Sequence, residues 1–389
     1  MKLHLTLTLM LCSATAFAQQ ALNSFNAVTS PQINADATAT FRYYNPGAGS
    51  VKVIGDFVSA DGSETPRVIE LTKSDNGVWE GTTPAPLAPE LYSYALEVDG
   101  MRTVDPSNVY LARDISTLSN IFLVDGGYRG LYGVNDVPHG TVSKEWYHSD
   151  LLGTDRRLTV YTPAGYETSG RNYPVLYLLH GMGGDENAWS ELGRATQILD
   201  NMIASGEVRP MIVVMPNGNV DMPAAPGESH LGLTVPHTDL PHTMDGVFEQ
   251  AFPEIVNYID ANYRTRRDKA SRAVAGLSMG GFHSLHVSKD YPDMMGYVGL
   301  FSAAVDPFKA ESLPRYADME EKLAVQFANP PRLYYIAIGS DDFLYDTNVR
   351  YRALLDSKGY PYTYVESPEG HIWKNWRRYL TDFLPRLFK

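Results

Sequence analysis

The sequence has little cysteine and no long basic or apolar run after its N-terminus. Its 389 residues include one cysteine, Cys12, so a framework of disulfides within the chain is excluded. No stretch after residue 18 approaches the ~20 apolar residues of a membrane span. Acidic residues outnumber basic ones by 45 to 32, for a net charge of −13. Phosphate backbones and anionic membrane surfaces repel such a chain, so we expect neither nucleic acid nor a membrane as a partner.

The N-terminus has the pattern of a secretion signal. Lys2 precedes an apolar segment over residues 3–11, and residues 16–18 read Ala-Phe-Ala, a small-x-small cleavage site. We predict residues 1–18 as a signal peptide and the protein as secreted or periplasmic. Cleavage there removes Cys12 and leaves no thiol nucleophile in the mature chain. A lipid anchor at Cys12 is disfavoured, because the residues before it are not small.

The region from 24 to 125 has the short alternating strands of an all-β domain. Residues 40–44 alternate in polarity, and Asn76-Gly77 separates two strand candidates, which is a strong hairpin signal. We predict a small β-sandwich over residues 24–125. Turn-rich residues 126–140 are expected to form a linker.

The pattern changes over residues 141–389. Short, continuously apolar runs typical of buried parallel strands occur at 175–179, 211–215, 273–275 and 333–338. Helical patterns lie between them. Alternation of this kind predicts a doubly wound α/β domain, so the fold class is α/β with a preceding β-sandwich.

Ser278 is the candidate nucleophile. It lies at the centre of Gly276-Leu277-Ser278-Met279-Gly280, directly after the run 273–275 and before a helical pattern. A nucleophile elbow needs this strand–turn–helix context, with small residues beside a strained serine. The alternative is a tight turn with an inert serine.

A serine hydroxyl needs a base, and the base needs an acid to orient it. In this fold the chain order is serine, acid, histidine. His371 is the only histidine after Ser278 that stands outside the elbow's own helix, and it follows a strand candidate. Asp341 and Asp342 both follow the run 333–338, and spacing alone does not separate them.

An oxyanion site needs two backbone donors. One is expected from Met279, the residue after the nucleophile. The other is expected from the run His180–Gly184, which follows a strand; Met182 is our choice, with Gly181 as the alternative. His180 and Gly181 are also substrate-binding candidates.

The polar stretch 217–244 contains three histidines and three acidic residues, including Asp239. A metal site is one interpretation, but no tight ligand pairing occurs, and a binding loop over the cleft explains the composition as well. We expect no metal and no cofactor.

Several aromatic residues have two interpretations, as sugar-binding surfaces or as packing in the core. Trp376 is expected to pack, whereas Trp189 is a candidate substrate subsite. The same choice concerns Trp373 in the second domain and Trp79, Tyr92 and Tyr94 in the first.

The second domain resembles the esterase-D-like hydrolases, and among them carbohydrate esterase family 1. The resemblance covers about residues 138–389 and rests on these motifs: Arg157–Pro163, Leu179–Gly184, Ala275–Gly281 and Gly370–Trp376. The family places its acid in a Gly-x-x-Asp pattern, which maps onto Gly339 and Asp342. The resemblance therefore implies Ser278, Asp342 and His371 as the catalytic triad.

The first domain is similar to carbohydrate-binding module family 48 around Asp56, Trp79 and Tyr92. Together the two resemblances imply an exported feruloyl esterase acting on plant cell-wall arabinoxylan, with an acetyl-xylan esterase as the alternative. The two differ in the expected acyl pocket, which is long and apolar for a hydroxycinnamate and short for acetate. A hydrolase of siderophores or other small esters, and a carbohydrate-binding protein without activity, are further alternatives. The sequence leaves the oligomeric state open.

Overall fold

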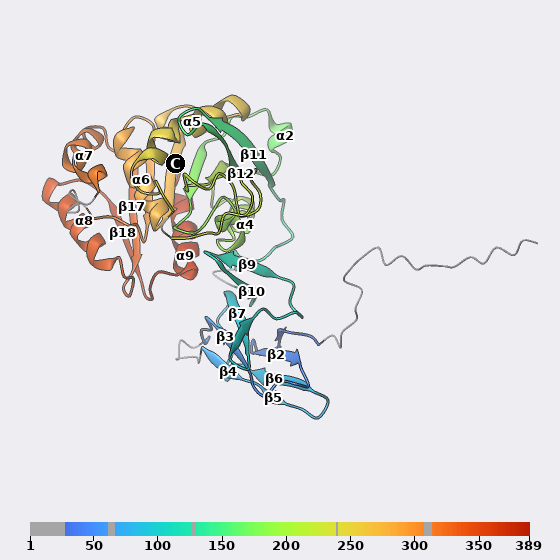
Figure 1. Ribbon diagram of the computed structural model, residues 1–389. Helices are drawn as coiled ribbons and strands as arrows, with labels where there is room; N and C mark the ends of the chain where they lie inside the picture. Colours follow the sequence, from blue (N-terminus) through green and yellow to red (C-terminus); the bar gives the residue numbers. More distant parts are fainter. Residues whose placement is uncertain (1–27, 61–66, 127–129, 239, 307–312) are drawn as a thin grey trace, which may run out of the picture.

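The computed structural model describes residues 28–60, 67–126, 130–238, 240–306 and 313–389. The predicted signal peptide lies outside these ranges, as do residues 24–27 of the predicted sandwich, 127–129 of the predicted linker and Asp239. A β-sandwich precedes a larger α/β domain, which confirms the predicted fold class (Figure 1). Within the described ranges, no helix has the length and apolar character needed to cross a membrane.

The N-terminal domain consists of two antiparallel sheets. One has the strand order β1-β2-β6-β5, and the other has the order β4-β3-β7-β10-β9, with β8 paired to β7. The strands are β1 (Gln32–Ile33), β2 (Ala39–Tyr44), β3 (Val51–Gly55), β4 (Val68–Glu70), β5 (Thr72–Lys73), β6 (Val78–Thr82), β7 (Leu91–Val98), β8 (Met101–Thr103), β9 (Leu111–Asp114) and β10 (Thr117–Leu123). The predicted Asn76-Gly77 turn joins β5 to β6, with Gly77 at φ +82°, a conformation that glycine adopts freely.

Aromatic residues fill the space between these sheets. Trp79, Tyr92 and Tyr94 are all buried, and the Tyr92 ring stacks on Phe122 with the centroids 5.4 Å apart and an interplanar angle of 30°. Of the two interpretations of these aromatics, the structure shows core packing.

The C-terminal domain is built on an eight-stranded sheet with the order β11-β12-β14-β13-β15-β16-β17-β18. Its strands are β11 (Thr141–Ser149), β12 (Thr154–Thr162), β13 (Val175–Leu179), β14 (Ile212–Pro216), β15 (Arg272–Leu277), β16 (Tyr297–Phe301), β17 (Leu333–Gly339) and β18 (Thr363–Ser367). The strands from β14 to β18 pair in parallel, and β13 to β17 are almost wholly buried, as continuously apolar runs require.

Helices cover both faces of this sheet (Figure 1). They are α2 (Tyr166–Ser169), α3 (Ala188–Glu191), α4 (Ala195–Ala204), α5 (Val247–Asn262), α6 (Met279–Asp290), α7 (Met319–Ala328), α8 (Tyr345–Lys358) and α9 (Trp373–Phe383), with short 3₁₀ turns η1 (Lys269–Ser271), η2 (Pro314–Tyr316) and η3 (Leu384–Arg386). The helices α5, α6, α7 and α8 share one hydrophobic core with the sheet, whereas α4 and α9 share the other. This is the two-layer burial that a parallel sheet requires.

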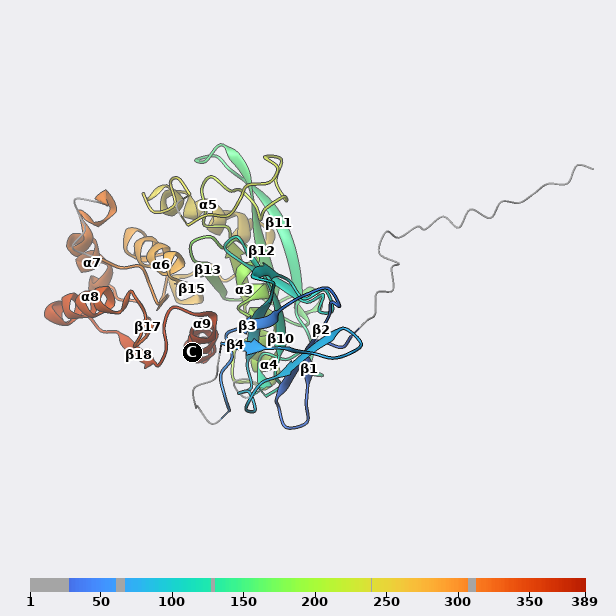
Figure 2. The ribbon, with the colours of Figure 1, turned by 60° about the horizontal axis from the view of Figure 1, so that its bottom comes forward.

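The two domains are in contact. Arg377 on α9 forms an ion pair with Glu90, with an N–O distance of 3.0 Å and at most 6% of either side chain exposed. Leu91, Ala112 and Ile121 pack on Leu192 of the α/β domain. Figure 1 and Figure 2 both show α9 next to the sandwich, as this ion pair requires. The predicted linker also packs: Leu131 and Tyr132 are buried in the α/β core, and Asn201 Nδ2 donates to the Leu131 carbonyl at 2.9 Å.

Candidate active site

Ser278 lies in a strained turn between β15 and α6. Its φ of +54° and ψ of −114° are unusual for a residue with a side chain, and such strain clusters at functional sites. The neighbouring glycines are sterically required. A Cβ at Gly276 would lie 2.4 Å from the carbonyl carbon of Gly280, and one at Gly280 would lie 2.4 Å from the Leu179 oxygen. The local sequence therefore produces the predicted elbow.

The backbone of Ser278 is held from several sides. Its N–H donates to the Phe301 carbonyl at 2.9 Å. Its own carbonyl accepts from the amides of Phe282 and Ala304, each at 3.0 Å. These bonds tie the strained residue to β16 and to the first turn of α6.

His371 is held by a buried carboxylate. Its Nδ1 lies 2.9 Å and 3.0 Å from the two carboxylate oxygens of Asp342. Asp342 is itself fixed, because its Oδ1 accepts from the Leu344 amide at 2.9 Å. Asp341 is exposed and its amide donates to the Glu369 carbonyl, so the structure separates the two adjacent aspartates that spacing left equivalent. With Nδ1 facing Asp342, Nε2 is the nitrogen left for a reacting hydroxyl.

Aromatic rings surround the imidazole. Phe343 is 75% exposed, yet its ring centroid lies 4.5 Å from that of His371. The Trp376 ring meets the imidazole edge-on, with the two centroids 4.9 Å apart, and the Trp373 ring meets Trp376 edge-on at 5.1 Å. Trp376 is buried as predicted, and it also contacts the candidate base.

One cavity of about 290 Å³ brings four of the predicted site residues together. Ser278, His371, Gly181 and Met182 all line it. Its apolar wall consists of Ile115, Leu192, Leu277, Phe343, Trp373 and Trp376. A pocket that joins a serine hydroxyl, an imidazole and an apolar wall is suited to covalent chemistry on an ester.

The two predicted oxyanion donors occupy different elements. Met279 is the first residue of α6, where a backbone N–H has no acceptor within the helix. Met182 lies in a tight turn closed by the Gly184 amide, which donates to the Gly181 carbonyl at 3.1 Å. A Cβ at Gly181 would lie 2.5 Å from Leu277 Cδ1, so the turn approaches the elbow closely.

Two substrate-binding predictions are wrong. His180 is buried: its Nδ1 bonds to the Gly181 carbonyl at 2.7 Å, and its Nε2 accepts from the Gly218 amide at 2.8 Å. Burial lowers the pKa of His180 to about 4, which keeps the ring neutral. Trp189 is 1% exposed, and its Nε1 donates to the Leu179 carbonyl at 2.9 Å. Both side chains are buried beneath the loop that follows β13, and neither lines the cavity.

The loop from 217 to 244 reaches the cavity through Thr238. Its first part is buried, where Asn217 Nδ2 donates to Glu186 at 3.0 Å and Asn219 Nδ2 to the Gly184 carbonyl at 2.8 Å. Among the residues with described positions, no group of three or more histidine, cysteine or acidic side chains is arranged to hold a metal ion.

Sequence reasoning missed the contribution of the N-terminal domain. Arg113, Asp114 and Ile115, at the β9–β10 turn, line the same cavity as Ser278. Desolvation by the cavity wall raises the pKa of Asp114, although its side chain is exposed. No local pattern marks these residues, because their role depends on how the two domains meet.

A larger cavity of about 880 Å³ adjoins this one between the domains. Both cavities include Asp114, Ile115, His371 and Trp373 in their walls. The sandwich side adds polar groups such as Asp56, Ser93 and Ser119. Desolvation in the space between the domains raises the pKa of Asp56, which is still reached by solvent.

Fold and site define an α/β-hydrolase with a serine elbow and an aspartate-bound histidine. Residues 149–387 match the family described as putative esterase, and residues 27–111 match carbohydrate-binding module 48, the isoamylase N-terminal domain. The chain belongs to this esterase family, and as a member it is classed as a carboxylic ester hydrolase.

Relatives agree with this membership. The chain is 30% identical over 366 residues to "Endo-1,4-beta-xylanase/feruloyl esterase" of Xylanibacter ruminicola, covering 92% of this chain and 46% of that protein. It thus spans about half the length of that relative. A solved ferulic acid esterase superposes with a TM-score of 0.54 at 28% identity, covering 64% of this chain and all but 1% of the other. The enterobactin esterase of Shigella flexneri shares the fold over 90% of this chain and 92% of its own, with a TM-score of 0.60 at 16% identity.

Proposed function

We propose that the chain is an exported serine esterase that releases hydroxycinnamoyl groups, such as feruloyl, from plant cell-wall polysaccharide. Ser278 is the nucleophile, His371 the general base, and Asp342 the group that orients and stabilises the imidazolium. The amides of Met182 and Met279 receive the oxyanion. No metal or cofactor takes part.

The reaction runs through an acyl-enzyme. Ser278 Oγ attacks the ester carbonyl carbon while His371 Nε2 takes the hydroxyl proton. The bond to the sugar oxygen breaks, and His371 returns that proton to the leaving alcohol. Water then gives a proton to His371 and attacks the acyl carbon. Ser278 regains its proton, and the free acid leaves.

The size and apolar wall of the smaller cavity are the observations that favour an aromatic acyl group over acetyl. This cavity has about 290 Å³ and an apolar wall that includes Trp373, Phe343 and Ile115. This is near the lower end of the ~300–1,000 Å³ typical of pockets for drug-sized ligands. An acetyl group, which is a carbonyl with one methyl, would leave most of that wall uncovered. An aromatic acyl group would cover it.

We place the sugar part of the ester, which leaves as the alcohol, in the larger cavity between the domains. Its walls carry hydroxyl, carboxyl and amino groups beside Trp373, as sugar binding requires. The similarity to a xylanase/feruloyl esterase and to carbohydrate-binding module 48 supports a xylan-type ligand. Nucleic acid and membranes remain unexpected as partners at a net charge of −13.

A paired assay tests the proposal on the chain from Gln19 onward. Hydrolysis of methyl ferulate is compared with acetate release from acetylated xylan. Ser278→Ala is the inactive variant, and Ser357→Ala, which changes an exposed serine on α8, is the control. We expect ferulate release that falls by at least about 10⁴-fold in Ser278→Ala and is unchanged in Ser357→Ala. Acetate release alone would move the assignment to acetyl-xylan esterase. Ferulate release that survives in Ser278→Ala would overturn the serine mechanism.

A further inference from the structure

The tip of the β9–β10 hairpin is strained. Two residues, Ile115 and Ser116, connect these antiparallel strands, and Ile115 has a φ of +52°. Hairpin turns place glycine, asparagine or aspartate at such positions, because a β-branched side chain is crowded there. An isoleucine in this conformation destabilises the turn, which indicates that its side chain makes a contact of functional value.

The Ile115 side chain lies against the loop that follows β13. A Cβ added to Gly183 would lie 2.8 Å from both Cγ1 and Cγ2 of Ile115. Gly183 itself has a φ of +73°. The hairpin tip therefore contacts the turn that carries Met182, at a point where only glycine leaves room.

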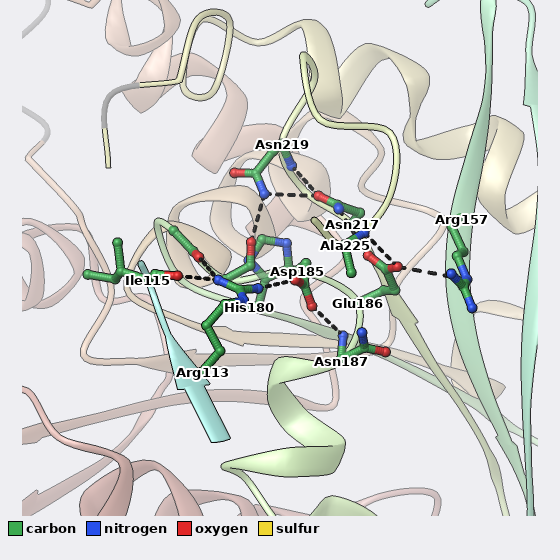
Figure 3. Close-up of polar contacts among 12 residues, drawn as sticks. Arg113, Ile115, Arg157, His180, Asp185, Glu186, Asn187, Asn217, Asn219 and Ala225 are labelled. Carbon is green, nitrogen blue, oxygen red and sulfur yellow. Dashed lines mark hydrogen bonds and ion pairs between the residues drawn. The ribbon is translucent and has the colours of Figure 1, made fainter. Parts of the chain in front are cut away.

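Arg113 bonds to the same loop. Its Nη1 donates to the carbonyls of Ile115 and, at 3.1 Å, Gly183, and its Nη2 forms an ion pair with the Asp185 carboxylate (Figure 3). The Asp185 side chain is 2% exposed, and its Oδ1 accepts from the Asn187 amide at 2.8 Å. One guanidinium thus joins the hairpin, the oxyanion turn and a buried carboxylate, which is the fork geometry that arginine provides.

The α/β domain holds this loop from the opposite side. There Asn219 donates to the Gly184 carbonyl, and Glu186 bonds to Asn217 and to the Ala225 amide at 2.9 Å (Figure 3). Removing Arg113 would leave a buried carboxylate without its cation, and such a group relaxes toward water. The turn would then be fixed on one side only.

Buried contacts between the two domains hold the β9–β10 hairpin in place. Arg377 pairs with Glu90 and also donates to the Leu192 carbonyl at 2.7 Å. The packing of Ala112 and Ile121 on Leu192 lies directly behind the tip. The contact of the tip with Gly183 therefore continues from buried packing around Leu192, while the tip itself lines the cavity.

We propose that Arg113 and Ile115 are positioning residues for the ester site: the N-terminal module fixes the turn that aims the Met182 amide at the oxyanion. This inference rests on the proposed function, since it assumes an oxyanion at this turn. It gives the module a role in turnover of small esters that contain no sugar. A module that acts only by binding polysaccharide would have no such effect.

The test uses the full chain, methyl ferulate as substrate, and the variants Arg113→Met and Ile115→Gly. Loss of one oxyanion donor costs about 10²–10³-fold in kcat, so a misaimed donor should cost about 10- to 100-fold. For Arg113→Met we expect KM to change less than about threefold, because the donor acts in the transition state. Ile115→Gly also removes part of the apolar wall of the acyl pocket, so its KM should rise as its kcat falls. Arg113→Lys should restore part of the loss. Arg42→Met removes an arginine–carboxylate pair elsewhere in the sandwich and should leave kcat unchanged.

Ile115→Gly keeps the proposal testable if Arg113→Met folds poorly. Glycine relieves the positive φ, so the melting temperature should be equal to or above that of the wild type, while kcat still falls. If Ile115 only stabilised the fold, a lower kcat would be accompanied by a lower melting temperature. Wild-type kcat in both variants would overturn the positioning role while leaving the proposed function intact. No activity in the wild-type chain would instead count against the proposed function.

Discussion

Asp342 and Asp341 are adjacent in the chain, but only Asp342 contacts His371. Asp342→Asn keeps the side-chain shape and removes the charge that holds the imidazole tautomer and stabilises the imidazolium. We expect kcat on methyl ferulate to fall by about 10³–10⁴-fold. Asp341→Asn should stay within about twofold of the wild type. Steady-state kinetics on the two variants distinguishes them, and equal losses in both would contradict the assignment.

Buried histidines predict a loss of stability in mild acid. Burial lowers the pKa of His180 from 6.5 to about 4, and it lowers the pKa of His286 well below its ordinary value. Between pH 6.5 and 4 the unfolded chain binds protons at these positions that the folded chain does not, so the free energy of unfolding falls as pH falls. Each pKa unit corresponds to about 1.4 kcal/mol.

Urea unfolding at steps from pH 7 to pH 4 measures this dependence. His180→Gln removes one titrating group, so its stability should fall less steeply over the same range. The same slope in the variant and the wild type would show that His180 does not contribute.

At the scale of elements, the elbow between β15 and α6 depends on Gly280. A Cβ there would lie 2.4 Å from the Leu179 oxygen and 2.6 Å from the His180 oxygen, which are backbone atoms that cannot easily move. We expect Gly280→Ala to destabilise the fold by about 1–3 kcal/mol and to lower kcat. Gly47→Ala meets only Asn45 Oδ1, at 3.6 Å, and should change stability by less than about 0.5 kcal/mol. Equal unfolding midpoints for the two variants would contradict this steric account.

The elements near the nucleophile were predictable because their signals are local. Apolar runs predicted β13, β15 and β17, and the order of Ser278, aspartate and histidine follows from the fold. His180 and Trp189 were wrongly predicted as substrate contacts, because a motif shows which residues belong to a loop but not which way they point. Their direction is set by hydrogen bonds that the motif does not specify: His180 accepts from the distant Gly218 amide, and Trp189 donates to the Leu179 carbonyl.

At the scale of the whole molecule, the interface between the domains is the feature that the sequence did not reveal. Arg377 and Glu90 are far apart in the chain, and each reads locally as an ordinary surface charge. The same holds for Arg113 and Asp185. Periodicity and turn signals describe single elements, so they contain no information on which charges are buried between two domains.

The buried pair Arg377–Glu90 predicts that the domains unfold together. Arg377→Met leaves Glu90 buried without its cation, and we expect a loss of about 3–5 kcal/mol and separate unfolding of the two domains. Calorimetry should show one transition in the wild type and two in the variant. The exposed pair Lys358–Glu320 is the control, since Lys358→Met should cost less than about 1 kcal/mol. A similarly small loss in Arg377→Met would mean that the interface does not couple the domains.

The central claim is that Ser278 carries the acyl group. The most direct measurement is mass spectrometry of peptides from enzyme quenched in acid during turnover of methyl ferulate. We expect a feruloyl adduct on the peptide that contains Ser278, and no such adduct in Ser278→Ala. A feruloyl adduct on a different residue, or ferulate release by Ser278→Ala at the wild-type rate, would contradict this claim.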